Sequence, residues 1–408
     1  MKIAQINMVS TSSTGKIMLQ IARCGRERGH ETYTFSVPGF SIRHPEKLVP
    51  HPGHTYVGTP FEHAVHYVLG RYTGHLGYFS QITTWQLIRR LKQIQPDIIH
   101  LHNIHNWSLN FPMLVSYLKS SGAKVVWTLH DCWTFTGQCP YFDMAGCDRW
   151  KTGCHDCPQC DVYPETNVDR SRQMYRKKQE WFLNIPDMVL VTPSRWLAEL
   201  TEQSYMGGYP VRVIHNGIDL EVFRPCESDF RQRYGCENQI LLLGVAFGWG
   251  KRKGLDVFIE LSKRLDSRYR IVLVGTDETT DAVLPDNIIS IHTTQNQQEL
   301  AAIYSAADCF VNPTREDNFP TVNLEALACG TPVVTFHTGG SPECLDETCG
   351  IVVEKDDVDG LEWAVRRICD EKPFSPQACR ARAEQFGMYD RFAEYIDLYE
   401  EIMGGTTT

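Results

Sequence analysis

The chain has 408 residues, of which 42% are hydrophobic and 22% are charged, and this supplies enough apolar material for two buried cores. Its net charge of −9 argues against nucleic acid as a partner. No apolar run of about 18 residues is present. The N-terminal MKIAQINMVS continues into a polar Ser/Thr/Gly stretch where a signal peptide would be apolar, so we expect a cytoplasmic protein.

The first half of the chain alternates short apolar runs with helical patterns. We predict strands at residues 2–7, 32–37, 97–102 and 124–129, with a helix at residues 14–29 that ends at a glycine. Short, continuous apolar strands followed by polar loops are typical of a parallel sheet that is covered on both faces. This part of the sequence therefore predicts a Rossmann-like α/β domain.

The alternation starts again after residue 215. The predicted elements are strands at residues 239–245, 270–274 and 308–312, and helices at residues 255–265, 297–307 and 389–403. The restart predicts a second α/β domain.

The segment Thr314–Gly330, TREDNFPTVNLEALACG, joins the strand that ends near residue 312 to a helix, and it carries the carboxylates Asp317 and Glu325. In a doubly wound sheet such a loop lies at the carboxyl end of a strand, where ligands bind, and the helix points N–H groups at an anion. On its own, the segment is more simply explained as a solvated loop with a carboxylate at a helix start.

Four further segments accompany this one along the chain. They are VTPS at residues 191–194, IHNGID at residues 214–219, Lys253–Gly254, and GGSPE at residues 339–343. Together with the D-x7-E segment they resemble, in order and spacing, the motifs of the GT-B fold, family 4 retaining glycosyltransferases (glycosyl transferases group 1). Among these, the chain is similar to bacterial enzymes of surface-polysaccharide biosynthesis, of the colanic acid and capsule type. The resemblance covers nearly the whole chain.

The resemblance implies an α/β, GT-B architecture of two Rossmann-like domains that face each other across a cleft. The acceptor-side domain would be residues 1–210, with a Cys-rich insertion at about residues 132–165, and the nucleotide-sugar domain residues 211–388. In the family, a C-terminal helix, here within residues 389–408, crosses back to the first domain.

The implied activity is that of a retaining hexosyltransferase. It would move a sugar from a UDP- or GDP-sugar to a glycan or to a lipid-linked saccharide, in capsule, lipopolysaccharide or related polysaccharide biosynthesis. Lipid-linked acceptors are common in the family, which implies peripheral contact with the inner face of the membrane. The basic residues Arg89, Arg90 and Lys92 are nevertheless more simply explained as a solvated helix face.

Chemistry at the donor calls for positive charge, because breaking the bond between sugar C1 and the diphosphate leaves an anion. No D-x-D type metal site is evident, so we expect no catalytic metal and assign this role to Arg252 and Lys253. The family usually has an arginine five or six residues before the lysine of K-G, where this chain has Phe247 and Gly248. Arg252, Lys251 or a residue elsewhere would take that role.

The remaining donor-side residues follow from the resemblance. Glu325 would bind the ribose hydroxyls, since a carboxylate accepts two O–H bonds at once. Asp317 would lie nearer the transferred sugar, with Glu316 as its rival. Further donor-binding candidates are Asn318, Phe319, Glu343 and, in the first domain, Gly15 with its neighbour Lys16, whose loop lacks the residues of a Walker A motif.

The acceptor-side candidates lie at the ends of two strands in the first domain. His130 matches the active-site histidine of the family, where a neutral imidazole can hydrogen-bond a sugar hydroxyl, and Asp131 would fix its tautomer or cap a helix. His102, Asn103 and His105 follow the preceding strand, and we expect them to line the acceptor side.

The insertion contains Cys139, Cys147, Cys154 and Cys157, which we predict to hold a structural zinc ion. Cys160 and His155 are rival ligands, and free thiols or disulfides are the alternatives. The segment offers little apolar material for a core of its own, so a metal would act as a staple.

Two other functional classes stay open. A GT-B sugar-nucleotide epimerase would turn over its donor without an acceptor, and a non-catalytic, zinc-stabilised scaffold would have no turnover. For a transferase we favour front-side attack, because no carboxylate is obviously placed as a covalent nucleophile.

Overall fold

The computed structural model describes residues 1–11, 13–38, 51–105 and 107–404. Contacts within the chain group it into two compact units, a first unit of residues 1–214 with residues 391–408 and a second unit of residues 215–390. Ser12 of the predicted ligand loop and residues 405–408 of the predicted tail lie outside the described residues. The domain limits written from the sequence stay a prediction.

The first unit is built on a seven-stranded sheet in the order β3-β2-β1-β4-β5-β6-β7, and every strand pair in it is parallel. The strands are β1 (Lys2–Ile6), β2 (Glu31–Ser36), β3 (His54–Tyr56), β4 (Ile98–Leu101), β5 (Lys124–Thr128), β6 (Met188–Thr192) and β7 (Val211–Val213). The central strands β4 and β5 are almost wholly buried, as the apolar runs predict.

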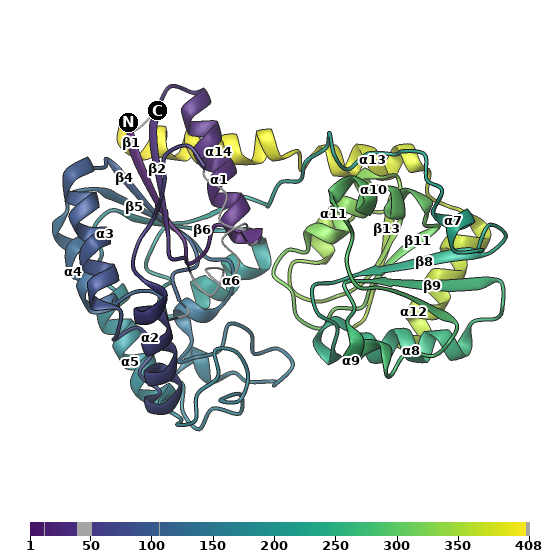
Figure 1. The fold of residues 1–408 in the computed structure, drawn as a ribbon, viewed down its shortest axis with the longest axis horizontal. Helices are drawn as coiled ribbons and strands as arrows, with labels where there is room; N and C mark the ends of the chain where they lie inside the picture. The colour runs from purple at the N-terminus through teal and green to yellow at the C-terminus, as the bar shows by residue number, and fades with distance from the viewer. Residues whose placement is uncertain (12, 39–50, 106, 405–408) are drawn as a thin grey trace. The chain divides into compact units, whose positions relative to one another are not determined.

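Helices cover both faces of this sheet (Figure 1). They are α1 (Ser13–Glu27), α2 (Pro60–Thr73), α3 (Gln81–Ile94), α4 (Phe111–Ser120), α5 (Ser171–Phe182), α6 (Arg195–Gln203) and α14 (Met388–Gly404). Helix α14 returns the chain to the first unit, where Tyr395 and Tyr399 are buried.

The second unit has a six-stranded parallel sheet in the order β10-β9-β8-β11-β12-β13. Its strands are β8 (Ile240–Val245), β9 (Tyr269–Val274), β10 (Ile288–Ile291), β11 (Cys309–Asn312), β12 (Val333–Phe336) and β13 (Gly350–Val353). Its helices are α7 (Phe230–Arg233), α8 (Leu255–Arg264), α9 (Glu278–Asp281), α10 (Gln297–Ala306), α11 (Thr321–Ala328), α12 (Val358–Arg366) and α13 (Pro376–Glu384).

The predicted α/β class with two parallel-sheet, Rossmann-like domains is confirmed. In each sheet the strand order reverses beside the first strand of its unit, β1 or β8, and such a reversal is where ligands bind in doubly wound folds. Within the described part of the chain, no helix combines the length and the apolar character that crossing a bilayer would require.

Candidate active site

The acidic loop of the second unit, residues 313–320, runs from the end of β11 to the start of α11 and is fixed by Arg315. This mostly buried arginine donates to both carboxylate oxygens of Asp256, at 2.8 and 2.9 Å, and to Asp356 at 2.6 Å. Its peptide N–H also donates to the carbonyl of Arg252 at 2.9 Å. A planar guanidinium suits such a bidentate pair. Arg315 therefore clamps the acidic loop to the turn before α8.

That clamp brings the two predicted cations to the acidic loop. The Nζ of Lys253 lies 2.6 Å from Oδ2 of Asp317, and both side chains are largely buried. Nη1 of Arg252 donates to the carbonyl of Glu316 at 3.2 Å, whereas Lys251 is exposed. Of the two neighbouring candidates for the family's arginine role, Arg252 is the one that faces the acidic loop.

Two glycines explain why these loops can approach so closely. Gly254 ends the short turn Lys251–Lys253 with a φ of 76°, and a Cβ there would lie 2.5 Å from the carbonyl oxygen of Pro313. Gly339 has a φ of 55°, and its Cβ would lie 1.8 Å from the carbonyl oxygen of Asp317. A side chain at either position would push a loop away from Asp317. The K-G and GGSPE segments are thus packed directly on the acidic loop.

The carboxylates Glu325 and Glu343 each have an oriented partner. Glu325 lies in the second turn of α11 rather than at the helix start, and its Oε2 accepts from the hydroxyl of Tyr304 at 3.1 Å. Oε2 of Glu343 lies 3.0 Å from Nε2 of His215, the histidine of the IHNGID segment. These contacts hold both carboxylates in defined orientations.

Three other predicted donor residues are buried in the same loop. Glu316, Asn318 and Phe319 are 5, 4 and 4% exposed. The Phe319 ring packs on His215 and Phe386, with centroids 4.9 and 5.8 Å apart, so it supports the loop from within the core. The Phe319 side chain thus packs within the loop, which is one of the two roles expected for it, and its contact with the sugar stays a prediction.

In the first unit, His130 follows β5 and is joined to a buried chain of polar groups. Nε2 of His102 donates to Oε1 of Gln5 at 3.0 Å, so Nδ1 of a neutral His102 must accept. Nε2 of His130, 3.1 Å away, then donates to it. Burial lowers the pKa of His130 to about 4 and also lowers that of His102. Both imidazoles are neutral near pH 7, and Nδ1 of His130 carries the lone pair.

This arrangement changes the role of His102. We expected His102 to line the acceptor side, but it is 1% exposed and both of its ring nitrogens are engaged. A residue in that position orients His130 and does not itself contact an acceptor. The strand pattern could not reveal this, because His102 and Gln5 meet only through the pairing of β1 with β4.

Asp131, Asn103 and His105 form a second group beside His130. Nε2 of His105 donates to Oδ2 of Asp131 at 3.0 Å, and the N–H of Trp133 donates to Oδ1 at 2.9 Å. Burial acts to raise the pKa of Asp131, but the charge and hydrogen bond of His105 and the Trp133 N–H outweigh it and hold this pKa below the ordinary value. Asn103 also donates to Asp131, at 3.4 Å. Asp131 is thus an ionised group turned toward His105, and its charge acts on both His105 and His130.

Helix α14 supports this histidine cluster from the far end of the chain. The hydroxyl of Thr128 donates its hydrogen to the hydroxyl of Tyr395 at 3.3 Å, so it accepts from Nε2 of His100 at 2.8 Å. The other ring nitrogen of His100, Nδ1, then accepts from the hydroxyl of Tyr399 at 2.6 Å. The His100 and His102 rings lie 4.0 Å apart. The roles of Tyr395, Tyr399 and Gln5 could not be inferred from the sequence, because each depends on tertiary packing.

Gly15 and Lys16 stand at the start of α1. Gly15 packs so closely on its own loop that a Cβ would lie 2.5 Å from the carbonyl carbon of Ser10, while Lys16 is exposed. Packing on Ser10 is by itself enough reason for a glycine there. A ligand role for Gly15 stays a prediction.

The four predicted zinc ligands of the insertion, Cys139, Cys147, Cys154 and Cys157, lie near one another between β5 and α5. Burial, followed by the charges of Cys157 and Cys154, raises the pKa of the Cys139 thiol, and the Gly137 N–H donates to Sγ of Cys154 at 3.1 Å. Even so, the described residues contain no group of three or more His, Cys, Asp or Glu side chains arranged to hold a metal ion. These thiols are therefore close to one another, but their sulfur atoms are not arranged to coordinate a metal ion.

The aromatic side chains of the insertion pack on the core of the first unit. Trp150 is buried against Phe142 and Phe135, with ring centroids 5.0 and 5.4 Å away. The buried Nζ of Lys178 donates to the carbonyls of Trp133 and Thr136, at 2.7 and 3.1 Å. The aromatic residues of the segment belong to the same buried cluster as the strands of the first unit, so the segment packs on the core of that unit rather than on a separate one. All fifteen cysteines of the chain are free thiols.

Two protein-family models and one related protein match this chain. A model of the family described as Glycosyltransferase Family 4 matches residues 14–222, and one described as Glycosyl transferases group 1 matches residues 237–371. WcaC of Escherichia coli (strain K12), whose name assigns it to colanic acid biosynthesis as a glycosyl transferase, is 26% identical over 320 residues, which are 75% of this chain and 77% of WcaC.

Two solved structures show the same fold. Sucrose-phosphate synthase of Thermosynechococcus elongatus has a TM-score of 0.72 and 17% identity, over 99% of this chain and 100% of its own. HepE of Anabaena, solved in complex with UDP, has a TM-score of 0.68 and 15% identity, over 98 and 99% of the two chains. Because the first family model spans more than half of the sequence, the chain belongs to Glycosyltransferase Family 4, and it is a glycosyltransferase with a GT-B fold.

Proposed function

We propose that the protein transfers a hexose from a UDP- or GDP-sugar to a saccharide or lipid-linked saccharide, with retention of anomeric configuration, in surface-polysaccharide biosynthesis. The observation that carries the proposal is the contact of Lys253 and Arg252 with the acidic loop, 2.6 and 3.2 Å long. Similarity to WcaC, named for colanic acid biosynthesis, supports the pathway class, and the HepE complex with UDP supports a nucleotide donor.

The donor diphosphate is assigned to Lys253 and Arg252. Departure of the diphosphate leaves negative charge on its oxygen, and two cations fixed beforehand stabilise that charge without reorganisation. Asp317 holds the Lys253 ammonium in place, and the diphosphate competes with this carboxylate for it. Asp317 is then available to the hydroxyls of the transferred sugar.

The ribose is assigned to Glu325. An ionised carboxylate can accept about four hydrogen bonds, and Tyr304 provides one of them. Accepting capacity is left for two vicinal hydroxyls. Glu343, oriented by His215, is the corresponding acceptor for hydroxyls of the sugar.

The acceptor hydroxyl is assigned to His130. With a pKa lowered to about 4 by burial, His130 is neutral and too weak a base to remove a hydroxyl proton fully. Its Nδ1 can accept a hydrogen bond and so orient the hydroxyl. In the front-side reaction that we favour, the bond from C1 to the phosphate oxygen breaks as the bond from C1 to the acceptor oxygen forms, and the leaving phosphate oxygen takes the acceptor's proton.

A cytoplasmic place of action is part of the proposal. Cysteines in reducing compartments rarely form disulfides, and no two of the fifteen cysteines of this chain are joined by a disulfide bond.

The proposal is tested by a product assay with a panel of UDP- and GDP-sugars and saccharide acceptors. Formation of a glycoside that keeps the donor's anomeric configuration, shown by proton NMR, is the expected result. Donor turnover without an acceptor would identify an epimerase, and donor binding without any turnover would identify a scaffold.

A structural zinc ion held by Cys139, Cys147, Cys154 and Cys157 also belongs to the proposal. The proximity of these thiols and the N–H···S contact at Cys154 support it, although the sulfurs would have to draw together on binding. Elemental analysis of untagged protein purified without added metal should find about one zinc per chain. Negligible zinc, with these thiols freely titratable in the native protein, would exclude the site.

A further inference from the structure

The Cys-rich insertion runs into a loop, residues 160–167, whose backbone is fixed by hydrogen bonds. The N–H of Thr166 donates to the carbonyl of Cys160 at 2.7 Å, which closes the loop on itself. The buried side chain of Gln138 donates to the carbonyl of Pro164 at 3.0 Å and accepts from the hydroxyl of Thr166 at 3.0 Å. This loop is therefore held in one conformation by groups of the insertion itself.

Contacts with two helices hold the insertion on the first unit. The N–H of Asn167 donates to the carbonyl of Arg71 on α2 at 2.7 Å. The carboxylate of Asp169 accepts from the N–H groups of Cys157 and Ser171, both at 2.8 Å, and so ties the insertion to the start of α5. The loop of residues 160–167 thus lies between two fixed attachments.

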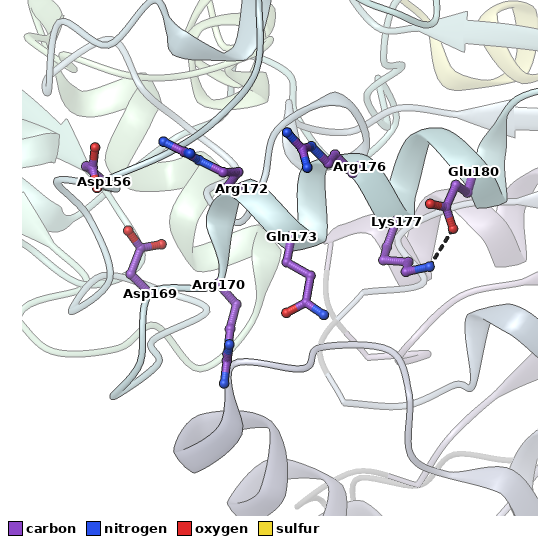
Figure 2. A pocket seen from close by; sticks show the side chains of 8 residues that line it. All are labelled: Asp156, Asp169, Arg170, Arg172, Gln173, Arg176, Lys177 and Glu180. Carbon is purple, nitrogen blue, oxygen red and sulfur yellow. Dashed lines mark hydrogen bonds and ion pairs between the residues drawn. The ribbon is translucent and has the colours of Figure 1, made fainter.

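Beside the second attachment, a hollow of about 410 Å³ runs along α5 (Figure 2). It is lined by four cationic, three acidic and one amide side chain, and its Lys177 is paired with Glu180 at 2.6 Å. Sugar-binding pockets need an apolar face as well as polar groups, because a sugar ring presents C–H groups between its hydroxyls. The residues that line this hollow provide no such face, so we looked for a saccharide contact on the loop itself.

Tyr163 stands in the middle of the loop, with its hydroxyl turned inward and its ring exposed. The hydroxyl lies 3.3 Å from Nδ1 of His105. Burial raises the pKa of Tyr163, and the charge of Asp131 adds to this effect. The residue is nevertheless 40% exposed. Because the hydroxyl is buried, this exposed area lies mainly on the ring.

Two neighbouring rings fix the orientation of the Tyr163 ring. Its centroid lies 6.0 Å from that of His105 and 6.1 Å from that of Trp107, which it meets edge to face at 88°. Both of these neighbours are buried. A ring that is already held in place loses little conformational freedom when a ligand covers its free face. Tyr163 is therefore a preorganised aromatic surface.

The polar groups behind Tyr163 lead to the proposed acceptor site. Nε2 of His105 donates to Asp131 at 3.0 Å, so Nδ1 of a neutral His105 accepts from the hydroxyl of Tyr163. Asp131 directly follows His130, to which the acceptor hydroxyl is assigned, and Asn103 also donates to Asp131. Two hydrogen bonds therefore link the exposed ring to a group of polar side chains that can bind hydroxyls.

We propose that Tyr163 is a binding contact for the saccharide acceptor, with the exposed face of its ring stacked on a sugar ring; the assignment rests on the proposed transfer to a saccharide. The face of an aromatic ring carries partial negative charge and attracts the C–H hydrogens of a pyranose. Hydroxyls at the edge of the same saccharide then reach the polar groups around His130. The Cys-rich insertion thereby contributes to the choice of acceptor, while the donor-binding residues lie in the second unit.

Saturation-transfer NMR tests this contact without requiring turnover. Full-length protein saturated with UDP is mixed with the methyl glycosides of glucose, galactose and mannose, and aromatic protein protons are irradiated. The wild type transfers saturation to the C–H protons of at least one glycoside. Tyr163→Ala lowers this transfer several-fold, whereas Tyr163→Phe keeps the ring and retains most of it. The matched control Tyr234→Ala removes a tyrosine of similar exposure, 42%, from the second unit and leaves the transfer unchanged.

Transfer kinetics with the acceptor found in the product assay give a second readout. Tyr163→Ala raises the KM for the acceptor by about tenfold, while kcat and the dissociation constant of UDP stay close to those of the wild type. Tyr163→Leu, which fills the same space without an aromatic face, guards against a folding defect and behaves as Tyr163→Ala does. Tyr163→Phe has a KM close to that of the wild type.

Three results would overturn the proposal. They are a wild type that transfers saturation to none of the glycosides, an unchanged KM in Tyr163→Ala, and a Tyr163→Phe variant as impaired as Tyr163→Ala, because the hydroxyl and not the ring face would then matter. Saturation transfer that depends on Tyr163, without formation of any product, would contradict the proposed transferase activity and support the saccharide contact.

Discussion

In the first unit the central candidate residues are buried imidazoles linked by a hydrogen bond between their rings, whereas in the second unit they are charged groups that form ion pairs. His130 and His102 are neutral because burial lowers their pKa values. Lys253 and Asp317 face each other as opposite charges. A neutral network can orient a hydroxyl, and a charged one can bind and release a diphosphate. This difference is the basis on which we propose that the first unit binds the acceptor hydroxyl and the second unit binds the donor.

The largest expected effect of this difference between the units is on the stability of the first unit at low pH. Burial lowers the pKa of His54 and His130 to about 4 and that of His66 to about 3, and it also lowers those of His63, His100 and His102. All six lie in the first unit, while the three histidines of the second unit are partly or fully exposed.

The sign of this effect follows from linkage. Below about pH 6.5 these histidines are protonated in the unfolded chain but stay neutral in the folded one. Their contribution to the free energy of unfolding is therefore fully present above that pH. It is lost as the pH falls to about 4 for His54 and His130, and to about 3 for His66. Each histidine contributes up to about 1.4 kcal/mol per pH unit in its window.

We therefore expect the first unit to lose stability before the second as the pH falls. Urea unfolding at about pH 7.5 and about pH 5, followed for each unit by proteolysis and mass spectrometry, measures this. Equal losses in the two units would contradict the comparison.

The next largest effect is expected for Lys253→Ala. Removing one preorganised, charge-stabilising group costs about a hundredfold or more in rate, and here it also leaves Asp317 without the ammonium at 2.6 Å. Single-turnover kinetics with saturating donor measure the chemical step. The matched control is Lys263→Ala, an exposed lysine on α8, which should retain the wild-type rate. Near-normal turnover in Lys253→Ala would move the diphosphate to another site.

A smaller effect is expected for His102→Leu. This change removes the acceptor for Nε2 of His130, so His130 populates both neutral tautomers. The fraction of the tautomer with the proton on Nε2, which leaves Nδ1 to accept from the acceptor hydroxyl, is then lower. We expect the rate to fall by about tenfold, with the donor dissociation constant unchanged and the acid limb of the pH profile shifted. Thermal unfolding controls for folding. A variant whose rate and pH profile equal those of the wild type would show that His102 only fills space.

The smallest effect is expected for Tyr304→Phe. Loss of one hydroxyl that donates to Glu325 removes about 0.5–1.5 kcal/mol, so the donor should bind a few-fold more weakly. Calorimetric titration with UDP measures the change. Unchanged affinity would mean that Tyr304 does not orient the ribose-binding carboxylate.

The elements and the loop positions were largely predictable from sequence because they depend on local patterns. β8 was predicted at residues 239–245 and is found at Ile240–Val245, and α8 at 255–265 is found at Leu255–Arg264. The K-G and GGSPE segments were noted as motifs, and the structure gives their physical reason, the close packing of Gly254 and Gly339 on the acidic loop.

What the sequence could not provide were partners brought together by the sheets. Gln5 and Tyr304 hold His102 and Glu325, yet each lies on an element that no motif marks. Arg315 lies within the Thr314–Gly330 segment, but its partners Asp256 and Asp356 come from other parts of the second unit. Helix α2 (Pro60–Thr73) was not predicted from the sequence. Its buried positions are His63, His66 and Gly70, whereas its apolar Phe61 and Tyr72 are exposed, so its sequence does not have the apolar buried face by which such a helix is recognised.

The division of roles between the units is tested most directly by titrating UDP into the full-length protein, with Glu325→Gln and His130→Ala compared side by side. Glu325→Gln removes a charge from the ribose-binding position and should weaken UDP binding by about tenfold or more, since hydrogen bonds to charged groups contribute about 1.5–3 kcal/mol. His130→Ala should bind UDP as the wild type does and fail only in transfer to an acceptor. Loss of UDP binding in His130→Ala, or wild-type affinity in Glu325→Gln, would contradict the assignment of donor and acceptor to the two units.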